Sequence, residues 1–249
     1  MARKRDIVVR DNQGWAFWAA DRFTKRAKEC VTSHGRFTVA LSGGSTPRPV
    51  HRLLGQGPYR SEIPWTGTHL FWVDDRCVPE TSPASNFGAA KQDLLDHIPL
   101  PASQIHPMPV AAPPEDGARQ YEQELREFFA SDKSGFPVFD WIFLGVGQDG
   151  HMASLFPGHD SLDEREQWVV VAKGGSPHVS RLTMTLPVLN SAREIVFLVA
   201  GKGKAAVMQA IFEESGTLLP AQRVQPVTGR LTWLVEKQAS SLLSREVTC

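Results

Sequence analysis

The sequence has few cysteines, and none of them form a pair at metal-binding spacing. Its three cysteines, Cys30, Cys77 and Cys249, are odd in number and widely separated in a chain of 249 residues. A disulfide framework or a zinc ribbon is therefore not expected, and a reducing, cytoplasmic setting is the economical interpretation. The eight histidines form no HExxH motif and no His–carboxylate cluster along the sequence. We therefore predict no metal site.

The sequence also lacks an excess of charge of one sign and lacks a long apolar run. The 27 basic residues balance 27 acidic ones, so no global field argues for nucleic acid or a membrane as partner. A small anionic ligand would need a local cationic patch instead. No segment approaches the roughly 20 apolar residues that a membrane span needs. The basic start, MARKR, is followed by no such run, so we expect a frayed, solvated terminus without targeting or anchoring.

Hydrophobic residues make up an ordinary 41% of the chain, and they fall into strand-like runs that alternate with helix-like stretches. Helices are predicted at 12–33, where Asn12 can act as cap, and at 86–97, 115–130 and 202–214. Six prolines make 99–114 a connector, with a short strand at 104–108. Strands are predicted at 37–41, 69–73, 139–146, 168–172, 181–186, 194–200 and 231–235. This alternation predicts an α/β fold, a mostly parallel sheet with helices on both faces, in one domain spanning 1–249.

The run at 139–146 is apolar enough to be buried on both faces, as a central parallel strand is. It leads through two glycines to Asp149-Gly150-His151. Because ligands of open α/β sheets bind beyond the carboxyl ends of the strands, an acid and an imidazole there are placed for proton transfer. We therefore expect His151 to be a general base and Asp149 its partner. In the alternative interpretation, Asp149 caps a helix that starts near Met152, and His151 is a surface residue.

A glycine-rich turn follows the predicted strand at 37–41. Thr46 can cap the next helix, with Pro47 at its first position. Converging N–H groups, hydroxyls and a helix dipole make this an anion site, although a tight turn could need glycine for geometry alone. The sequence has neither a Gly-Lys-Ser/Thr loop, nor dinucleotide-fingerprint spacing, nor a G-x-S-x-G elbow. The candidate anion-binding residues are Ser42, Gly43, Gly44, Ser45 and Thr46.

Further charged residues lie at the ends of predicted elements. Asp74, Asp75 and Arg76 follow the strand at 69–73, either as a structural ion pair or as a base and an anion clamp. Arg181 and Lys204 are by default scattered surface charges. A lysine near a helix start is unfavourable unless an anion lies nearby, however, so Lys204 hints at one.

Four motifs in order resemble the 6-phosphogluconolactonase family: LSGGSTP at 41–47, DDRCVP at 74–79 with SN at 85–86, GVGQDGHMASLFPG at 145–158, and RLTMTLPVLN with GKGKAA. The resemblance implies a Rossmann-like fold shared with glucosamine-6-phosphate isomerases and related to ribose-5-phosphate isomerase and CoA transferases. It implies hydrolysis of 6-phospho-D-glucono-1,5-lactone to 6-phosphogluconate, the second step of the oxidative pentose phosphate pathway, without metal or organic cofactor. The expected partner is this small phosphorylated lactone, bound by a monomer or a weak homodimer.

The resemblance also implies roles for individual residues. His151 resembles the family's general base and Asp149 its partner, while the 42–46 turn resembles the phosphate loop. Arg181 and Lys204 resemble its cationic clamps, and Arg76 the arginine beside the substrate. Two positions depart from the usual family pattern: Asp75 stands where Glu is usual, and Met152 stands where Thr is usual.

Two other functions stay open. An aldose–ketose isomerase acting on an amino sugar phosphate would use Asp74 as carbon base and His151 to help open the ring. A non-catalytic sugar-phosphate sensor would bind the same ligand without turnover. The segment LFPG after His151 and the Val78-Pro79 step resemble the lactonase version of the motifs.

Overall fold

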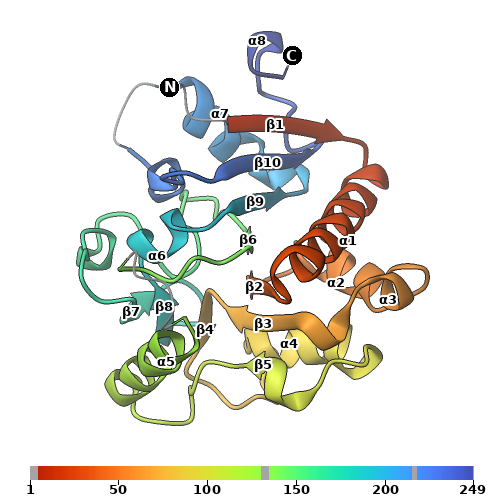
Figure 1. Cartoon of the computed structure of the whole chain (residues 1–249). Coiled ribbons are helices and arrows are strands. Elements are labelled where there is room, and N and C mark those ends of the chain that lie inside the picture. Colours follow the sequence, from red (N-terminus) through yellow and green to blue (C-terminus); the bar gives the residue numbers. More distant parts are fainter. Residues whose placement is uncertain (1–4, 130–134, 215–217, 249) are drawn as a thin grey trace.

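Seven parallel strands form the main sheet of the computed structural model, which describes residues 5–129, 135–214 and 218–248 (Figure 1). The strand at 139–146 was predicted to be central, and β6 indeed lies fourth among the seven. All neighbouring pairs run in the same direction. In spatial order the strands are β1 (Arg5–Arg10), β10 (Arg230–Glu236), β9 (Glu194–Val199), β6 (Trp141–Leu144), β2 (Phe37–Leu41), β3 (Thr68–Trp72) and β5 (Ile105–His106).

Helices cover both faces of this sheet, as the sequence predicted. Phe23 of α1 stacks on Phe143 with 5.9 Å between the ring centroids, while Phe212 of α7 meets Trp233 at 5.3 Å. The register places Phe143 and Trp233 on opposite faces, because Phe143 pairs with Val196 and Trp233 with the next residue of β9. The helices are α1 (Gly14–His34), α2 (Arg48–Leu54), α3 (Tyr59–Glu62), α4 (Asn86–Asp93), α5 (Pro114–Phe128), α6 (Leu186–Asn190), α7 (Ala205–Glu213) and α8 (Arg245–Thr248).

A second, smaller sheet of three antiparallel strands stands beside the first. It contains β4 (Asp74–Arg76), β8 (Val179–Met184) and β7 (Val169–Gly174), in that order. The sequence predicted β7 and β8 as strands but not their separate sheet, and it missed β4. Successive strands joined by a short turn pair antiparallel, so the 169–184 hairpin cannot join the parallel sheet through a helical crossover. Because β4 follows β3 directly, this sheet grows from the carboxyl edge of the large one.

Several predicted ends of elements were wrong. Asp11, not Asn12, supplies the side-chain oxygen at the start of α1. The backbone N–H of Gly14 donates to Asp11 Oδ1 at 2.6 Å. Thr46 does not cap α2, which begins at Arg48 after a turn and has no side-chain cap. The helix predicted at 86–97 ends at Asp93 and continues as a 3₁₀ turn, and the one at 202–214 likewise opens with a 3₁₀ turn. Sequence patterns place the ends of helices only to within one or two residues.

The edge strand β1 was missed altogether, because its apolar run is only three residues long, Ile7 to Val9, with charged residues on both sides. Arg5, expected to be frayed, belongs to β1, and residues 1–4 lie outside the described part of the chain. Ala130 and Cys249 also lie outside it. Within the described ranges, no helix combines the length and the apolar character that crossing a bilayer requires.

Candidate active site

Loops that follow four neighbouring strands line one cleft at the carboxyl edge of the main sheet. Ser42 follows β2, Asp74 follows β3, Gly145 follows β6, and Lys204 lies beyond β9. Parallel strands end at the same edge, so segments far apart in sequence meet there. Of the residues singled out in the sequence, those lining the cleft are Ser42, Gly43, Gly44, Ser45, Thr46, Asp74, Arg76, His151, Arg181 and Lys204.

Asp149 does not line the cleft but holds the histidine that does. The Nδ1 of His151 lies 2.5 Å from Asp149 Oδ1, and the backbone N–H of His151 donates to the same oxygen at 3.1 Å. Burial tends to raise the pKa of Asp149, but these hydrogen bonds from His151 outweigh it and the pKa lies below its ordinary value. With Nδ1 bound, Nε2 is the nitrogen that can serve a ligand. No helix starts at Met152, which instead bridges to Leu155, so the helix-cap interpretation of Asp149 was wrong.

Gly147 makes room for this pair. A Cβ on Gly147 would overlap the ring of His151 and would come within 2.5 Å of Asp149 Oδ1. The backbone N–H of Gly147 donates to the carbonyl of His151 at 2.8 Å, which closes the turn. Only glycine permits so close an approach of ring and backbone.

The glycine-rich turn at 42–46 packs against the start of α4. A Cβ on Gly43 would overlap the carboxamide of Asn86, and Gly44 has a φ of +89°, in the left-handed region that favours glycine. Both glycines are thus needed for geometry. The turn nevertheless faces the cleft, so the geometric and the anion-binding interpretations do not exclude each other.

The two arginines of the site face each other across β4 and β8. Arg76 and Arg181 are direct register partners. Arg181 is only 3% exposed, so the default interpretation of a scattered surface charge was wrong. Its Nε donates to the carbonyl of Gly174 at 3.0 Å, and its guanidinium lies 5.6 Å from the ring centroid of Phe156. Burial and the charge of Arg76 lower the pKa of Arg181. Like charges directly opposite on neighbouring strands are unfavourable unless an anion lies between them.

Lys204 adds a third cation from another element. It closes the 3₁₀ turn Lys202–Lys204 that precedes α7, and it is half-buried at the cleft. Burial lowers its pKa, while the charge of Asp149 acts in the opposite direction. An anion bound in the cleft would offset that cost of burial.

A family model described as glucosamine-6-phosphate isomerases/6-phosphogluconolactonase matches residues 10–233. The chain belongs to this family. It is 42% identical over 224 residues to a 6-phosphogluconolactonase of Synechocystis, covering 88% of this chain and 90% of the relative. It is also 42% identical over 232 residues to that of Rattus norvegicus, covering 90% and 88%. The solved 6-phosphogluconolactonase of Trypanosoma cruzi is 27% identical, covers 98% of each chain and superposes with a TM-score of 0.86.

The two neighbouring aspartates of this family member have different surroundings. Asp75 is 1% exposed and accepts the backbone N–H groups of Arg76, Asn86 and Phe87 at 2.7, 2.7 and 2.9 Å. Burial raises the pKa of Asp75 to about 6. Asp75 therefore fixes the start of α4, and it is not among the residues that line the cleft. Asp74 does line the cleft but is itself only 4% exposed.

Sequence reasoning missed two residues that contact Asp74. The Nδ2 of Asn86 donates to Asp74 Oδ1 at 3.2 Å, and the Oδ1 of Asn86 accepts from Arg76 Nη1 at 2.8 Å. The Oγ of Ser154 donates to Asp74 Oδ2 at 2.6 Å. Both residues lie inside motifs that carried the family resemblance, but nothing in their spacing pairs them with Asp74. Met152, the position at which the resemblance implies Thr, is 1% exposed.

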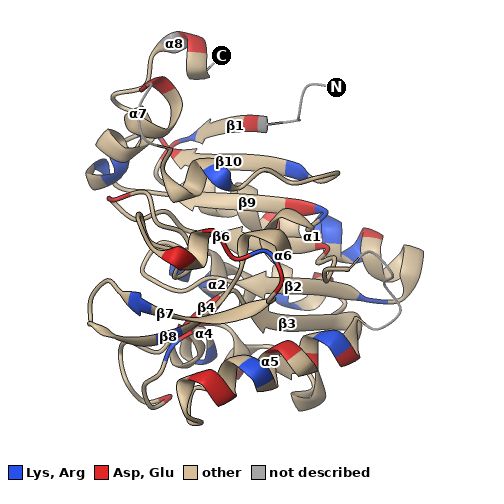
Figure 2. Cartoon of the chain, turned by 90° about the vertical axis from the view of Figure 1, so that its left-hand side faces the viewer, with Lys and Arg blue, Asp and Glu red and all other residues tan. Residues whose placement is uncertain are grey.

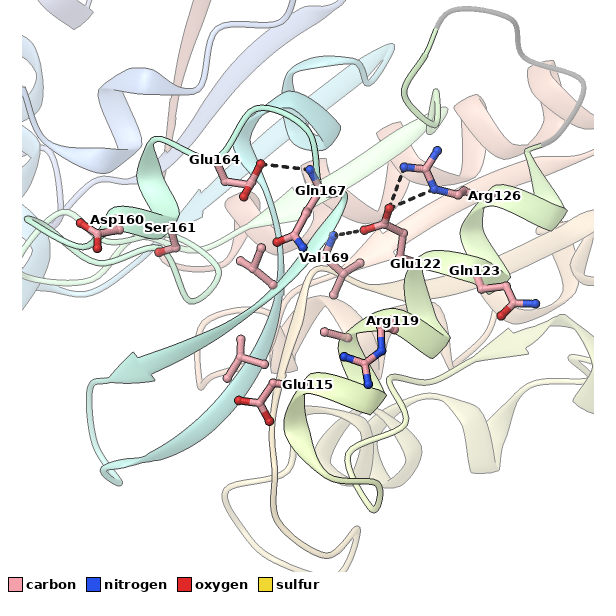
Figure 3. A pocket seen from close by; sticks show the side chains of 13 residues that line it. Glu115, Arg119, Glu122, Gln123, Arg126, Asp160, Ser161, Glu164, Gln167 and Val169 are labelled. Carbon is pink, nitrogen blue, oxygen red and sulfur yellow. Dashed lines mark hydrogen bonds and ion pairs between the residues drawn. The ribbon is translucent and has the colours of Figure 1, made fainter.

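A larger hollow lies elsewhere, between α5 and β7, and there Glu122 and Arg126 already pair with each other (Figure 3). Glu122 accepts from Arg126 at 2.6 Å and from the backbone N–H of Trp168 at 2.8 Å. Figure 2 shows charged residues of both signs along α5. None of the residues predicted to act on a ligand line this hollow, so size alone does not locate the site.

One cluster with metal-binding residue types appears only in the fold. The ligand atoms of Cys30, His34 and Asp140 lie within 4.8 Å of one another, although the sequence contained no such cluster. Asp140 precedes β6, so the cluster lies at the amino edge of the sheet, opposite the cleft. Its carboxylate accepts from the N–H and the hydroxyl of Thr38 at 3.0 and 2.9 Å and pairs with Arg193. These contacts account for Asp140 as a structural link between β2 and β6.

Proposed function

We propose that this protein hydrolyses 6-phospho-D-glucono-1,5-lactone to 6-phosphogluconate, the second step of the oxidative pentose phosphate pathway. The proposal is supported by relatives named 6-phosphogluconolactonase that are 42% identical over most of their length. The observation that carries it is a shared cleft. The imidazole of His151, oriented by Asp149, opens onto the same hollow as the glycine-rich turn, two arginines and a lysine.

The phosphate end of the substrate docks on the cationic side of this cleft. The turn of Ser42 to Thr46 offers hydroxyls and backbone N–H groups, and Arg181 and Lys204 supply positive charge. Both cations are partly or wholly buried, so a bound dianion gains more from them than it would from surface charges. This grip holds the lactone carbonyl near His151.

The chemistry then requires one base and one oxyanion partner. His151 Nε2 takes a proton from water while the water oxygen bonds to the carbonyl carbon. Arg76 stabilises the resulting oxyanion, and Asp149 stabilises the imidazolium. The intermediate collapses, the bond from the carbonyl carbon to the ring oxygen breaks, and the imidazolium returns its proton to that oxygen. General base catalysis contributes about 10²–10⁴-fold, and positioning adds to it.

The relatives named 6-phosphogluconolactonase favour hydrolysis over aldose–ketose isomerisation, and Asp74 has a structural role that fits this ranking. An isomerase of the kind considered above would use the carboxylate of Asp74 as carbon base. Here each oxygen of Asp74 already accepts a hydrogen bond, one from Asn86 and one from Ser154. Ammonia release from glucosamine 6-phosphate is the assay that would reverse this ranking. Binding of the lactone without turnover would instead support the sensor.

The deciding experiment measures lactone disappearance against its spontaneous hydrolysis. The wild-type protein should accelerate it, and His151→Ala should lose about 10²–10⁴-fold in kcat while still binding 6-phosphogluconate. His159→Ala is the matched control, because His159 is an exposed histidine near the same loop. Near-normal turnover in His151→Ala would refute the assigned base.

We further infer that the catalytic unit is the whole chain, 1–249, acting in the cytoplasm as a monomer or weak homodimer without nucleic acid or cofactor. The balanced charge of the sequence and its scarce cysteines support this. Light scattering during size-exclusion chromatography tests the oligomeric state. A stable dimer at micromolar concentration would contradict the monomer.

A further inference from the structure

Ser154 ties the histidine loop to the small sheet. The residue is fully buried, its Oγ donates to Asp74 Oδ2 at 2.6 Å, and its backbone N–H donates to Thr183 Oγ1 at 3.2 Å. Asp74 on β4 and Thr183 on β8 are register partners. Ser154 therefore bonds to both members of one cross-strand pair, joining the loop after β6 to two strands of the other sheet.

The pair that Ser154 grips lies beside the arginine pair. Asp74 and Arg76 are two residues apart on β4, and Thr183 and Arg181 are two apart on β8. Alternate residues of a strand share one face, and two steps along a strand span about 7 Å. Ser154 is therefore anchored on the face that carries Arg76 and Arg181, one pair away from them.

The backbone between His151 and Ser154 has an unusual conformation. Ala153 has a φ of +47°, and among the described residues it is the one non-glycine with positive φ. A positive φ is unfavourable for every residue with a Cβ, and it persists where contacts with the surrounding structure hold it. The turn lets His151 face the cleft while Ser154 enters the interior. The two hydrogen bonds of Ser154 hold the end of this turn that lies away from His151.

A second path continues from Asp74 to the substrate arginine. Asn86 donates to Asp74 Oδ1 and accepts from Arg76 Nη1. The hydroxyl of Ser154, the carboxylate of Asp74 and the carboxamide of Asn86 thus form a continuous chain that ends at the Arg76 guanidinium. Each member of this chain except Arg76 is buried.

We propose that Ser154 is a positioning residue of the hydrolysis: through Asp74 and Thr183 it fixes the His151 imidazole relative to the arginines that hold the substrate. The inference rests on the proposed function. A hydroxyl serving stability alone would change the fraction of folded protein, whereas a positioning hydroxyl changes the rate of the folded protein.

The test compares Ser154→Ala with Ser161→Ala. Ser161 is the matched control, because its Oγ is buried and has no hydrogen-bond partner within the described part of the chain. Ser154→Ala should lose about 10- to 100-fold in kcat per folded molecule, since small displacements of a base are costly. Its KM and its Kd for 6-phosphogluconate should stay within about threefold, because the phosphate contacts remain. Ser161→Ala should match the wild type in all three quantities.

Ser154→Thr restores a hydroxyl and should recover much of the lost kcat. A kcat of Ser154→Ala within about twofold of Ser161→Ala would overturn the inference. So would equal losses in the alanine and threonine variants, or a product Kd that weakens as much as kcat falls. A wild-type protein that does not exceed the spontaneous rate would overturn the proposed function itself, and the inference with it.

Discussion

Arg76 and Arg181 stand directly opposite each other on the antiparallel strands β4 and β8. Arg181 is 3% exposed, so its charge is held inside the protein beside a like charge. Burial and the charge of Arg76 lower the pKa of Arg181, and the charges of Asp74 and Asp75 oppose this change only in part. The arrangement is unfavourable in the free protein, and an anion bound between the two arginines, as proposed above, would offset the repulsion.

The first prediction concerns Arg181. Arg181→Ala should raise KM for the phosphorylated lactone by about tenfold or more, because hydrogen bonds to a charged group contribute about 1.5–3 kcal/mol. The effect on kcat should be smaller. Steady-state kinetics measure both, with circular dichroism to correct for the folded fraction. Arg165→Ala is the control, since Arg165 is an exposed arginine outside the residues lining the cleft. An unchanged KM would argue against a phosphate contact.

Asp149 should act through the charge it places beside His151. Asp149→Asn keeps the shape and an acceptor oxygen but removes the charge that stabilises the imidazolium. We expect kcat to fall about 10- to 100-fold with little change in KM. Asp160→Asn, at an exposed aspartate, should leave both constants unchanged. If both variants retain wild-type kcat, Asp149 is not the partner of the base.

Gly147 is predicted to be required for the position of the imidazole. An alanine there would overlap His151, which must then move away from its present place. A displacement of that size should lower kcat by about 100-fold while leaving product binding intact. Gly57→Ala provides the comparison, because a Cβ at Gly57 meets nothing within 4 Å. Equal activity of the two variants would contradict the assigned role.

The stability of the protein should fall in acid partly through His51. Burial lowers the pKa of His51 to about 4. The folded state therefore favours the neutral imidazole. The contribution of His51 to the unfolding free energy is fully present above the unfolded pKa of about 6.5, and it is lost as the pH falls toward about 4. The loss for one such group is about 3 kcal/mol. His51→Leu should flatten the decline of the unfolding free energy over this range.

Urea titrations at several pH values would measure that slope. His69, whose pKa burial also lowers to about 4, remains in the variant, so the decline should become shallower without disappearing. His178→Leu, at an exposed histidine, should leave the slope as it is. Parallel curves for the wild type and His51→Leu would mean that His51 does not titrate in this range.

The sequence by itself determined the elements that depend on local pattern. A short run buried on both faces predicts a central parallel strand, and β6 is one. Glycine pairs mark places where the backbone must turn or lie close to another group, as Gly43 and Gly147 do. Because the carboxyl ends of parallel strands meet at one edge, the 42–46 turn and His151, which each follow such a strand, line one cleft.

The tertiary structure alone decided which of these residues touch. Ser154 and Asp74 are 80 residues apart in the chain. Arg76 and Arg181 lie on strands of an antiparallel sheet that no local sequence pattern predicted. The burial of Arg181 and the cluster of Cys30, His34 and Asp140 likewise could not be predicted from the sequence. Local periodicity reports which face of an element is apolar, but contacts between distant polar side chains depend on how the sheets are joined and on their register.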